Sequence, residues 1–316
     1  MSESENDTGM TDPTTIPADI APKAAPEAPP PAEGKKAEKV NWVAEIRGLA
    51  IMLLAVLGFH SLIAKPFYIP SESMMPNLLV GDRLVVSKYP YGWSWVSASF
   101  HLLPRSTWRI AGKTPQYGDI VIAVPPDRPE DYIKRVIGLP GDRIALVDGR
   151  VRLNGKYVPR QVVPPVQIPV DANAKCDPLD YPGAQTRLPS GKVVCELESY
   201  RETLPNGATY TVIDHTNQPL DNYDEITVPD GYVFLMGDNR DHSADSRAPA
   251  APIGNGLGGP VPLSSVGGRA EFITFSLDGT MSLNPLSWWG AFRSGRAWTS
   301  LRPAHVETGN GDASGK

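Results

Sequence analysis

The sequence predicts a mainly β protein, with a single N-terminal transmembrane helix followed by a mostly antiparallel β domain that carries an inserted β/loop subdomain. Residues 48–64 form an apolar run without a formal charge, long enough to approach a membrane span. The 316 residues include 33 Pro and 29 Gly, which argues against a helical bundle because helix interiors exclude both. Beyond residue 66, short runs rich in Val, Ile, Tyr and Phe recur between turn dipeptides, as in β domains.

Composition excludes several classes of protein. The net charge of −5 provides no basic field for nucleic acid. Two cysteines are too few for a disulfide-dense mini-protein or a four-cysteine zinc site. The five histidines are scattered along the chain, which disfavours a metal enzyme.

The N-terminal region divides into two parts. Residues 1–40 hold seven prolines and no aromatic side chain, which predicts a disordered cytoplasmic tail, with a plain spacer as its simplest role. Residues 41–65 are interpreted as an uncleaved transmembrane signal anchor. A buried soluble helix and a cleaved signal peptide are the alternatives, and the long preamble and Leu62 before Ala64 disfavour cleavage.

Basic residues predict the orientation of this anchor. Lys35, Lys36, Lys39 and Arg47 precede the span, whereas Lys65 is the nearest basic residue after it. The positive-inside rule then places the N-terminus in the cytoplasm and the rest of the chain outside.

Residues 66–280 are expected to form the external β domain. Asp148-Gly149 and Asn154-Gly155 are strong hairpin signals. Residues 155–225 are proline-rich and weakly periodic, which indicates an insertion on the β core. Cys176 and Cys195 lie within it, and an external location permits a disulfide between them, with two free thiols as the alternative. The expected strands are 83–87, 119–124, 132–137, 143–147, 150–153, 232–236 and 270–276.

Residues 281–316 form a C-terminal segment with a frayed end. Its tryptophans and arginines suit a lipid headgroup interface, or equally a peripheral helix packed on the domain.

Three polar stretches carry candidate chemistry. Ser71 and Ser73 stand in a proline-bracketed, extended-looking stretch directly after the span, where one hydroxyl could be a nucleophile and the other an oxyanion donor. Lys134 sits in an apolar strand pattern, where burial favours the neutral amine that a general base requires. Residues 237–247 form a dense polar loop after an apolar strand.

These stretches, in this order after an anchor, resemble the conserved boxes of bacterial type I signal peptidases. The family patterns are Ser-x-Ser-Met-x-Pro, Lys-Arg-x-x-Gly-x-Pro-Gly-Asp and Gly-Asp-Asn-Arg-x-x-Ser-x-Asp-Ser-Arg. They match residues 71–76, 134–142 and 237–247, within a resemblance that covers about residues 42–280.

The resemblance implies a role for each matching residue. Ser73 would be the nucleophile and Lys134 the general base, with Ser71 and the Ser73 amide as the oxyanion hole. Ser243 would orient the lysine amine. Structural support would come from Asp238, Arg240, Asp245 and Arg247. Two extended segments, Phe67, Tyr68, Ile69 and Pro70 on one side and Asp131, Tyr132 and Ile133 on the other, would hold the substrate as an added strand.

Two positions depart from the family pattern. Glu72 stands between the serines, where a small residue is common, and strand alternation suggests that it points away from the lysine. His242 stands where Asn is frequent, which raises a rival Ser73–His242–Asp238 triad, although the sequence has no Gly-x-Ser-x-Gly elbow.

The resemblance predicts a serine endopeptidase that removes signal peptides from exported preproteins after small residues of the Ala-x-Ala type. Its partners would be signal peptides, the lipid bilayer and, by proximity, the secretion machinery, with no nucleic acid. It would be a single-pass protein of the bacterial inner membrane with its catalytic domain periplasmic. No cofactor or metal is implied, since a Ser–Lys dyad uses neither. The alternatives are a pilin- or conjugation-type processing peptidase of the same clan, and a catalytically silent scaffold that binds signal peptides.

Overall fold

One long helix precedes the β structure in the computed structural model, which describes residues 41–99 and 103–306. The chain divides into a unit that ends at Ile46 and a unit that begins at Arg47. Helix α1 (Trp42–Leu62) begins in the first unit and ends in the second, and none of its residues is buried. By length and composition it can cross a membrane. The expected tail, residues 1–40, lies outside the described residues.

The helix lies within the anchor expected over residues 41–65, although it begins before the apolar run 48–64 and ends two residues short of the end of that run. It begins earlier because the Asn41 side chain accepts a hydrogen bond from the backbone N–H of Ala44, as an N-cap does. It ends at Leu62 because Pro66 disfavours helical backbone at Lys65. The chain enters strand β1 (Ala64–Tyr68) instead.

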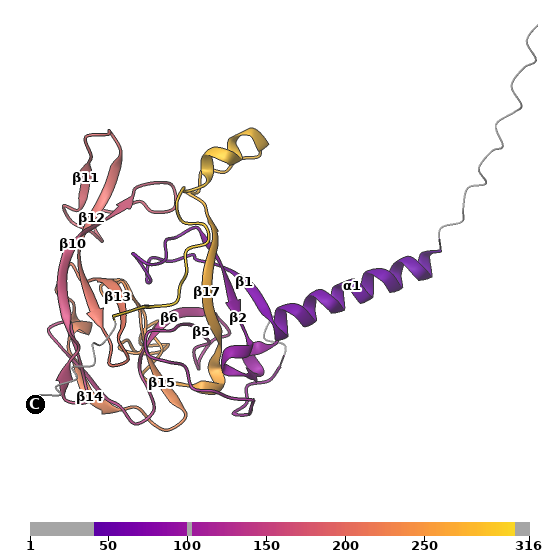
Figure 1. Cartoon of the computed structure of the whole chain (residues 1–316), viewed down its shortest axis with the longest axis horizontal. Coiled ribbons are helices and arrows are strands. Elements are labelled where there is room, and N and C mark those ends of the chain that lie inside the picture. The colour runs from indigo at the N-terminus through magenta and orange to yellow at the C-terminus, as the bar shows by residue number, and fades with distance from the viewer. Residues whose placement is uncertain (1–40, 100–102, 307–316) are drawn as a thin grey trace, which may run out of the picture. The chain divides into compact units, whose positions relative to one another are not determined.

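A seven-stranded antiparallel sheet contains Lys134, and the other two matched stretches, 71–76 and 237–247, lie in connections between its strands (Figure 1). Every neighbouring pair in it is antiparallel, as the alternating sequence pattern predicts. Its order is β1, β2 (Asp82–Ser87), β17 (Val266–Ser276), β5 (Ile120–Ala123), β6 (Tyr132–Gly138), β15 (Tyr232–Met236) and β16 (Val261–Pro262).

A second sheet shows how turn chemistry sets local structure. Asp148-Gly149 and Asn154-Gly155 connect its strands, and all four residues have positive φ, as two-residue hairpin turns require. Its strands are β14 (Tyr223–Thr227), β7 (Arg143–Val147), β8 (Arg150–Leu153) and β9 (Lys156–Tyr157).

The insertion supplies four strands of a further sheet, which β18 of the C-terminal segment completes, and two of these four are long strands that weak periodicity did not reveal. Bulges and paired prolines break the alternation within β10, which is why it was not recognised. The sheet comprises β10 (Arg160–Pro169), β11 (Gln185–Arg187), β12 (Val193–Thr203), β13 (Ala208–Ile213) and β18 (Ala304–His305). The remaining short elements are β3 (Trp93–Ser94), β4 (Arg109–Ile110) and 3-10 turns at 89–91, 95–97, 219–221, 263–265 and 285–291.

Hydrophobic contacts join the insertion, which is closed internally by a disulfide, to the segment between β1 and β2. Met75 and Leu79 from that segment share one buried cluster with Tyr181 of the insertion. Cys176 and Cys195, also in the cluster, form a disulfide. The insertion is therefore packed against the segment that contains Ser73.

The C-terminal arginines are held by carboxylates of the β domain. Arg293 pairs with Asp171, and Arg296 pairs with the fully buried Asp82. This matches the packed alternative for these arginines. The aromatic side chains are less engaged, since Trp289 is 84% exposed.

Candidate active site

Ser73 lies in a turn between β1 and β2. The expectation of an extended segment here is wrong, because the Met75 N–H donates to the Glu72 carbonyl and the Leu78 N–H donates to the Met74 carbonyl. The fully buried side chain of Met74 fixes this turn against the sheet. Ser73 itself is buried.

Lys134 projects from the middle of β6 onto this turn. Its Nζ donates hydrogen bonds to Ser73 Oγ at 2.8 Å and to the Ile133 carbonyl at 2.9 Å. Ser71 Oγ lies 3.4 Å from Ser73 Oγ. A hydroxyl, an amine and a second hydroxyl thus converge, as nucleophilic catalysis requires.

Burial lowers the pKa of Lys134 to about 8. Asp245 and Asp238 oppose this by favouring the ammonium, and Arg247 assists it. The loss of water around a charged amine outweighs the attraction of the two carboxylates. A substantial fraction of Lys134 is therefore neutral in mildly alkaline solution, where it can accept a proton.

The polar loop 237–247 is held by buried charge pairs. Asp238 accepts two hydrogen bonds from Arg135, at 2.7 and 2.6 Å, and a third from Asn77. Asp245 pairs with Arg247 and accepts the Gly237 N–H at 2.9 Å. The pKa of Asp245 lies below its ordinary value, because Arg247 and these hydrogen bonds overcome the effect of burial.

Three residues of this network, Glu202, Arg135 and Asn77, were not singled out from the sequence. Glu202 of β12 pairs with the predicted Arg240, and both side chains are 1% exposed. Arg135 and Asn77 both hold Asp238. Arg135 adjoins Lys134 in a matched motif, but nothing local marks Glu202, which lies in the insertion.

Ser243 is not hydrogen-bonded to Lys134, although the resemblance assigns it to orienting the amine. Its buried hydroxyl makes no well-formed hydrogen bond with any described residue, but it lies near enough to the Asp245 carboxylate to help lower the pKa of that group. It packs against Gly237, where an added Cβ would lie 2.2 Å from Ser243 Oγ and 2.5 Å from the Ser73 carbonyl. Glycine at 237 is needed for this close approach.

The rival triad is not assembled. His242 Nε2 lies 3.3 Å from the Asp180 carbonyl, and its ring is 4.6 Å from that of Tyr181. Asp238 is occupied by Arg135 and Asn77. The side chain that contacts the Ser73 hydroxyl is Lys134, not His242.

A cavity of about 320 Å³ opens beside Ser73 and Lys134. It is lined by both predicted extended segments, Phe67–Pro70 and Asp131–Ile133, together with Ser71 and His242. In the described sheet β1 pairs only with β2, and β15 pairs with β6 only from Arg135 onward. Two backbone edges at this cavity are thus open to a further strand.

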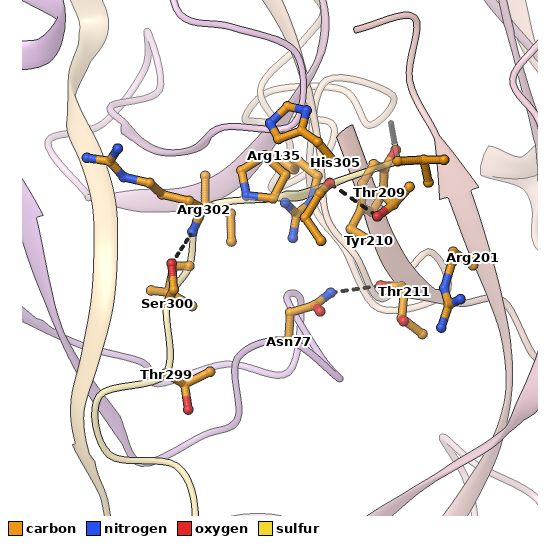
Figure 2. A pocket seen from close by; sticks show the side chains of 15 residues that line it. Asn77, Arg135, Arg201, Thr209, Tyr210, Thr211, Thr299, Ser300, Arg302 and His305 are labelled. Carbon is orange, nitrogen blue, oxygen red and sulfur yellow. Dashed lines mark hydrogen bonds between the residues drawn. The ribbon is translucent and has the colours of Figure 1, made fainter. Parts of the chain in front are cut away.

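A second cavity, of about 510 Å³, lies among polar side chains elsewhere. Figure 2 shows Asn77 in it, donating to the Thr211 carbonyl, with Arg135 and residues of the C-terminal segment around it. Ser73 and Lys134 line the first cavity and not this one.

Three carboxylates of the described residues, Asp214, Asp221 and Asp241, lie close enough to hold a cation, with oxygens within 4.8 Å of one another. Asp214 is paired with Arg160, and Asp241 accepts two backbone N–H groups. None of the three lines the cavity beside Ser73.

Comparisons with known proteins show which family the chain belongs to. Residues 40–275 match the family model "Signal peptidase, peptidase S26". The signal peptidase I of Rickettsia akari (strain Hartford) is 34% identical over 251 residues, covering 76% of this chain and 79% of that protein. The signal peptidase I of Rickettsia typhi (strain ATCC VR-144 / Wilmington) is 32% identical over 254 residues, covering 78% and 82%. A crystal structure of a signal peptidase I from Enterococcus faecalis V583 shares 25% identity, covers 50% of this chain and 97% of that chain, and gives a TM-score of 0.26.

A serine peptidase with one N-terminal apolar helix is the class of protein that these observations define. The chain belongs to the signal peptidase I family, peptidase S26. The mainly β fold and the family predicted from the three sequence stretches are confirmed.

Proposed function

We propose that this chain is a membrane-anchored endopeptidase that removes signal peptides from exported preproteins, with Ser73 as nucleophile and Lys134 as general base. The observation that carries the proposal is the 2.8 Å contact between Lys134 Nζ and Ser73 Oγ at the floor of the cavity. Membership of the signal peptidase I family supplies the class of substrate.

The substrate binds as an added strand. The open edges of β1 and of residues 132–134 offer backbone groups on either side of the cavity. Phe67, Ile69 and Ile133 give the cavity an apolar wall, which suits small side chains of the Ala-x-Ala type. Backbone pairing provides binding energy without sequence selection, and the cavity selects small residues before the cut.

The first half of the reaction forms an acyl-enzyme. Neutral Lys134 accepts the Ser73 hydroxyl proton while Oγ attacks the scissile carbonyl carbon. The Ser71 hydroxyl and the Ser73 N–H stabilise the resulting oxyanion. The Lys134 ammonium then gives its proton to the leaving amine, the C–N bond breaks, and the mature protein departs with a new N-terminus.

The second half releases the signal peptide. Lys134, neutral again, takes a proton from a water molecule that attacks the acyl carbon. The ester bond to Ser73 breaks, Oγ regains a proton from Lys134, and the signal peptide leaves as a carboxylic acid. Ser243, whose buried hydroxyl lies beside Gly237 and close to the Ser73 carbonyl, accepts a hydrogen bond from the amine during these transfers.

In this proposal helix α1 is the anchor that holds the enzyme at the membrane. Ser73 follows the helix after only a short strand, and signal peptides are apolar segments that reside in the bilayer. A cytoplasmic N-terminus and an external β domain follow from the positive-inside rule. The enzyme and the cleavage site then meet at the outer surface of the inner membrane.

The test uses the full chain in detergent with a preprotein that carries an Ala-x-Ala site. We expect the wild type to release the mature protein with the N-terminus directly after the second Ala, as measured by mass spectrometry. Ser73→Ala and Lys134→Ala should abolish release. Lys156→Ala, an exposed lysine of β9, serves as the control and should be fully active. Normal cleavage by Ser73→Ala would refute the proposal.

A further inference from the structure

Tyr181 belongs to the insertion, yet its hydroxyl reaches the residue beside Ser73. The side chain is 2% exposed. Its hydroxyl donates to Glu72 Oε2 at 2.7 Å and accepts a hydrogen bond from Asn239 Nδ2 at 2.9 Å. One phenol thus connects the insertion, the Ser73 turn and the polar loop.

Asn239 extends the same network along the backbone. Its Nδ2 also donates to the Glu72 carbonyl at 3.2 Å, and its backbone N–H donates to the Ser73 carbonyl at 3.1 Å. The peptide groups before and after Ser73 are therefore both held by one residue. Fixing these two peptide groups fixes the backbone dihedrals of Ser73, and with them the direction of its Cα–Cβ bond.

Tyr181 is itself rigidly placed. Its backbone N–H donates to the Asp177 carbonyl at 2.8 Å, directly after the disulfide-bonded Cys176. The ring packs with Met75 in the shared hydrophobic cluster and against the ring of His242. The hydroxyl has little freedom to follow Glu72 if the turn moves, so it acts as a fixed point for that turn.

This contact also accounts for Glu72, the residue that departs from the family pattern. The turn, rather than strand alternation, sets its direction, and its carboxylate is bound by Tyr181. A partly buried carboxylate without this donor would seek water and pull the turn with it. Because Glu72 adjoins Ser73, any such movement reaches the nucleophile.

We propose that Tyr181 is a positioning residue of this peptidase, whose hydroxyl, acting through Glu72 and together with Asn239, aims Ser73 Oγ at the scissile carbonyl. The inference rests on the proposed role of Ser73. It makes the insertion a working part of the active site, because the group that fixes the nucleophile's turn comes from a disulfide-closed loop more than a hundred residues away in sequence.

The first experiment compares Tyr181→Phe with Tyr117→Phe. Tyr117 is a matched control because its hydroxyl also donates to a carboxylate, Asp142, at 2.6 Å, and it does not line the substrate cavity. Tyr181→Phe should lower kcat about 10- to 100-fold, the scale of a misplaced reacting group. KM should change little, because the substrate-binding edges are intact. Equal kcat in the two variants would overturn the inference.

A double-mutant cycle separates positioning from general loosening. Glu72→Gln keeps an oxygen that Tyr181 can donate to, so it should retain most of the wild-type kcat, whereas Glu72→Ala should lose as much as Tyr181→Phe. The double variant Tyr181→Phe with Glu72→Ala should then be no slower than either single variant, because both remove one interaction. Multiplying losses would refute the coupling.

The same series distinguishes failure of this inference from failure of the proposed function. If Ser73→Ala remains active, the nucleophile is misassigned and the function itself fails. If Ser73→Ala is inactive while Tyr181→Phe matches Tyr117→Phe in kcat, only the inference fails. Melting temperatures of Tyr181→Phe and Tyr117→Phe should agree, so that the kcat loss is not attributable to unfolding.

Discussion

Lys134 Nζ lies 2.8 Å from Ser73 Oγ, although the two residues are 61 positions apart in the chain and one comes from a strand while the other comes from a turn. Both side chains are buried, so the pair is shielded from bulk water. Burial lowers the pKa of the lysine to about 8, so its amine is neutral often enough to accept a proton.

The pH dependence of cleavage should follow Lys134. The pKa of Lys134 is about 8, so below pH 8 the neutral fraction of its amine grows about tenfold for each unit by which the pH rises. We therefore expect kcat/KM to rise about tenfold per pH unit and to level off above pH 8. Lys134→Ala should be inactive across the range, and His242→Ala should keep the wild-type midpoint. A midpoint near 6.5 that disappears in His242→Ala would contradict this assignment.

Lys134→Met should lose activity yet gain stability at neutral pH. The folded state lowers the lysine pKa from 10.5 to about 8, so it disfavours the ammonium. By linkage, burial of the ammonium lowers the free energy of unfolding. This loss is fully present below pH 8, shrinks as the pH rises, and vanishes above the pKa of the lysine in the unfolded chain. At pH 7 it amounts to about 3 kcal/mol at most, which methionine would relieve. Urea unfolding of both proteins at pH 7 measures the difference in their free energies of unfolding. A Lys134→Met variant that is no more stable than the wild type would contradict the prediction.

Removal of Glu202 should destabilise the protein far more than removal of Glu225. Glu202→Ala would leave Arg240 as a buried, unpaired charge, so it should lower the free energy of unfolding by about 3–5 kcal/mol. Glu225 pairs with Arg152 at the surface, where Glu225→Ala should cost less than about 1 kcal/mol. Denaturant unfolding of both variants gives the comparison, and similar losses would show that the buried pair is dispensable.

Gly237→Ala should impair catalysis through crowding. The new Cβ would lie 2.5 Å from the Ser73 carbonyl, which is backbone and cannot rotate away. Overpacking of this kind costs about 1–3 kcal/mol and shifts the backbone, so kcat should fall along with the melting temperature. Gly290→Ala, where nothing lies within 4 Å, should behave as wild type. Unchanged kcat in Gly237→Ala would mean that the site tolerates a displaced Ser73.

Loss of the disulfide should lower stability. A crosslink between Cys176 and Cys195, which are 19 positions apart, contributes about 3 kcal/mol in the chain-entropy model. Replacing both cysteines by serine should lower the free energy of unfolding by about that amount, and reductant should do the same to the wild type. If neither treatment changes the unfolding curve, the two sulfurs are not bonded in solution.

Local signals in the sequence were sufficient for much of the fold. The apolar run predicted α1, and alternation between turn dipeptides predicted β7, β8 and β15 with their observed bounds. Asp148-Gly149 and Asn154-Gly155 predicted two hairpins, because few residue pairs accept positive φ at both positions. These signals act over a few residues, so they predict local structure without knowledge of the rest of the chain.

The three motifs named Ser73 and Lys134, but only the tertiary structure decided how each is held. The Ser73 segment is a turn rather than an extended strand, because burial of Met74 and contacts from Asn239 override its proline-bracketed appearance. Glu202 and Tyr181, both in the insertion, could not be assigned from their surroundings in sequence. A buried charge or hydroxyl takes its partner from whatever the fold brings within about 3 Å, and that partner is set by packing across the whole domain.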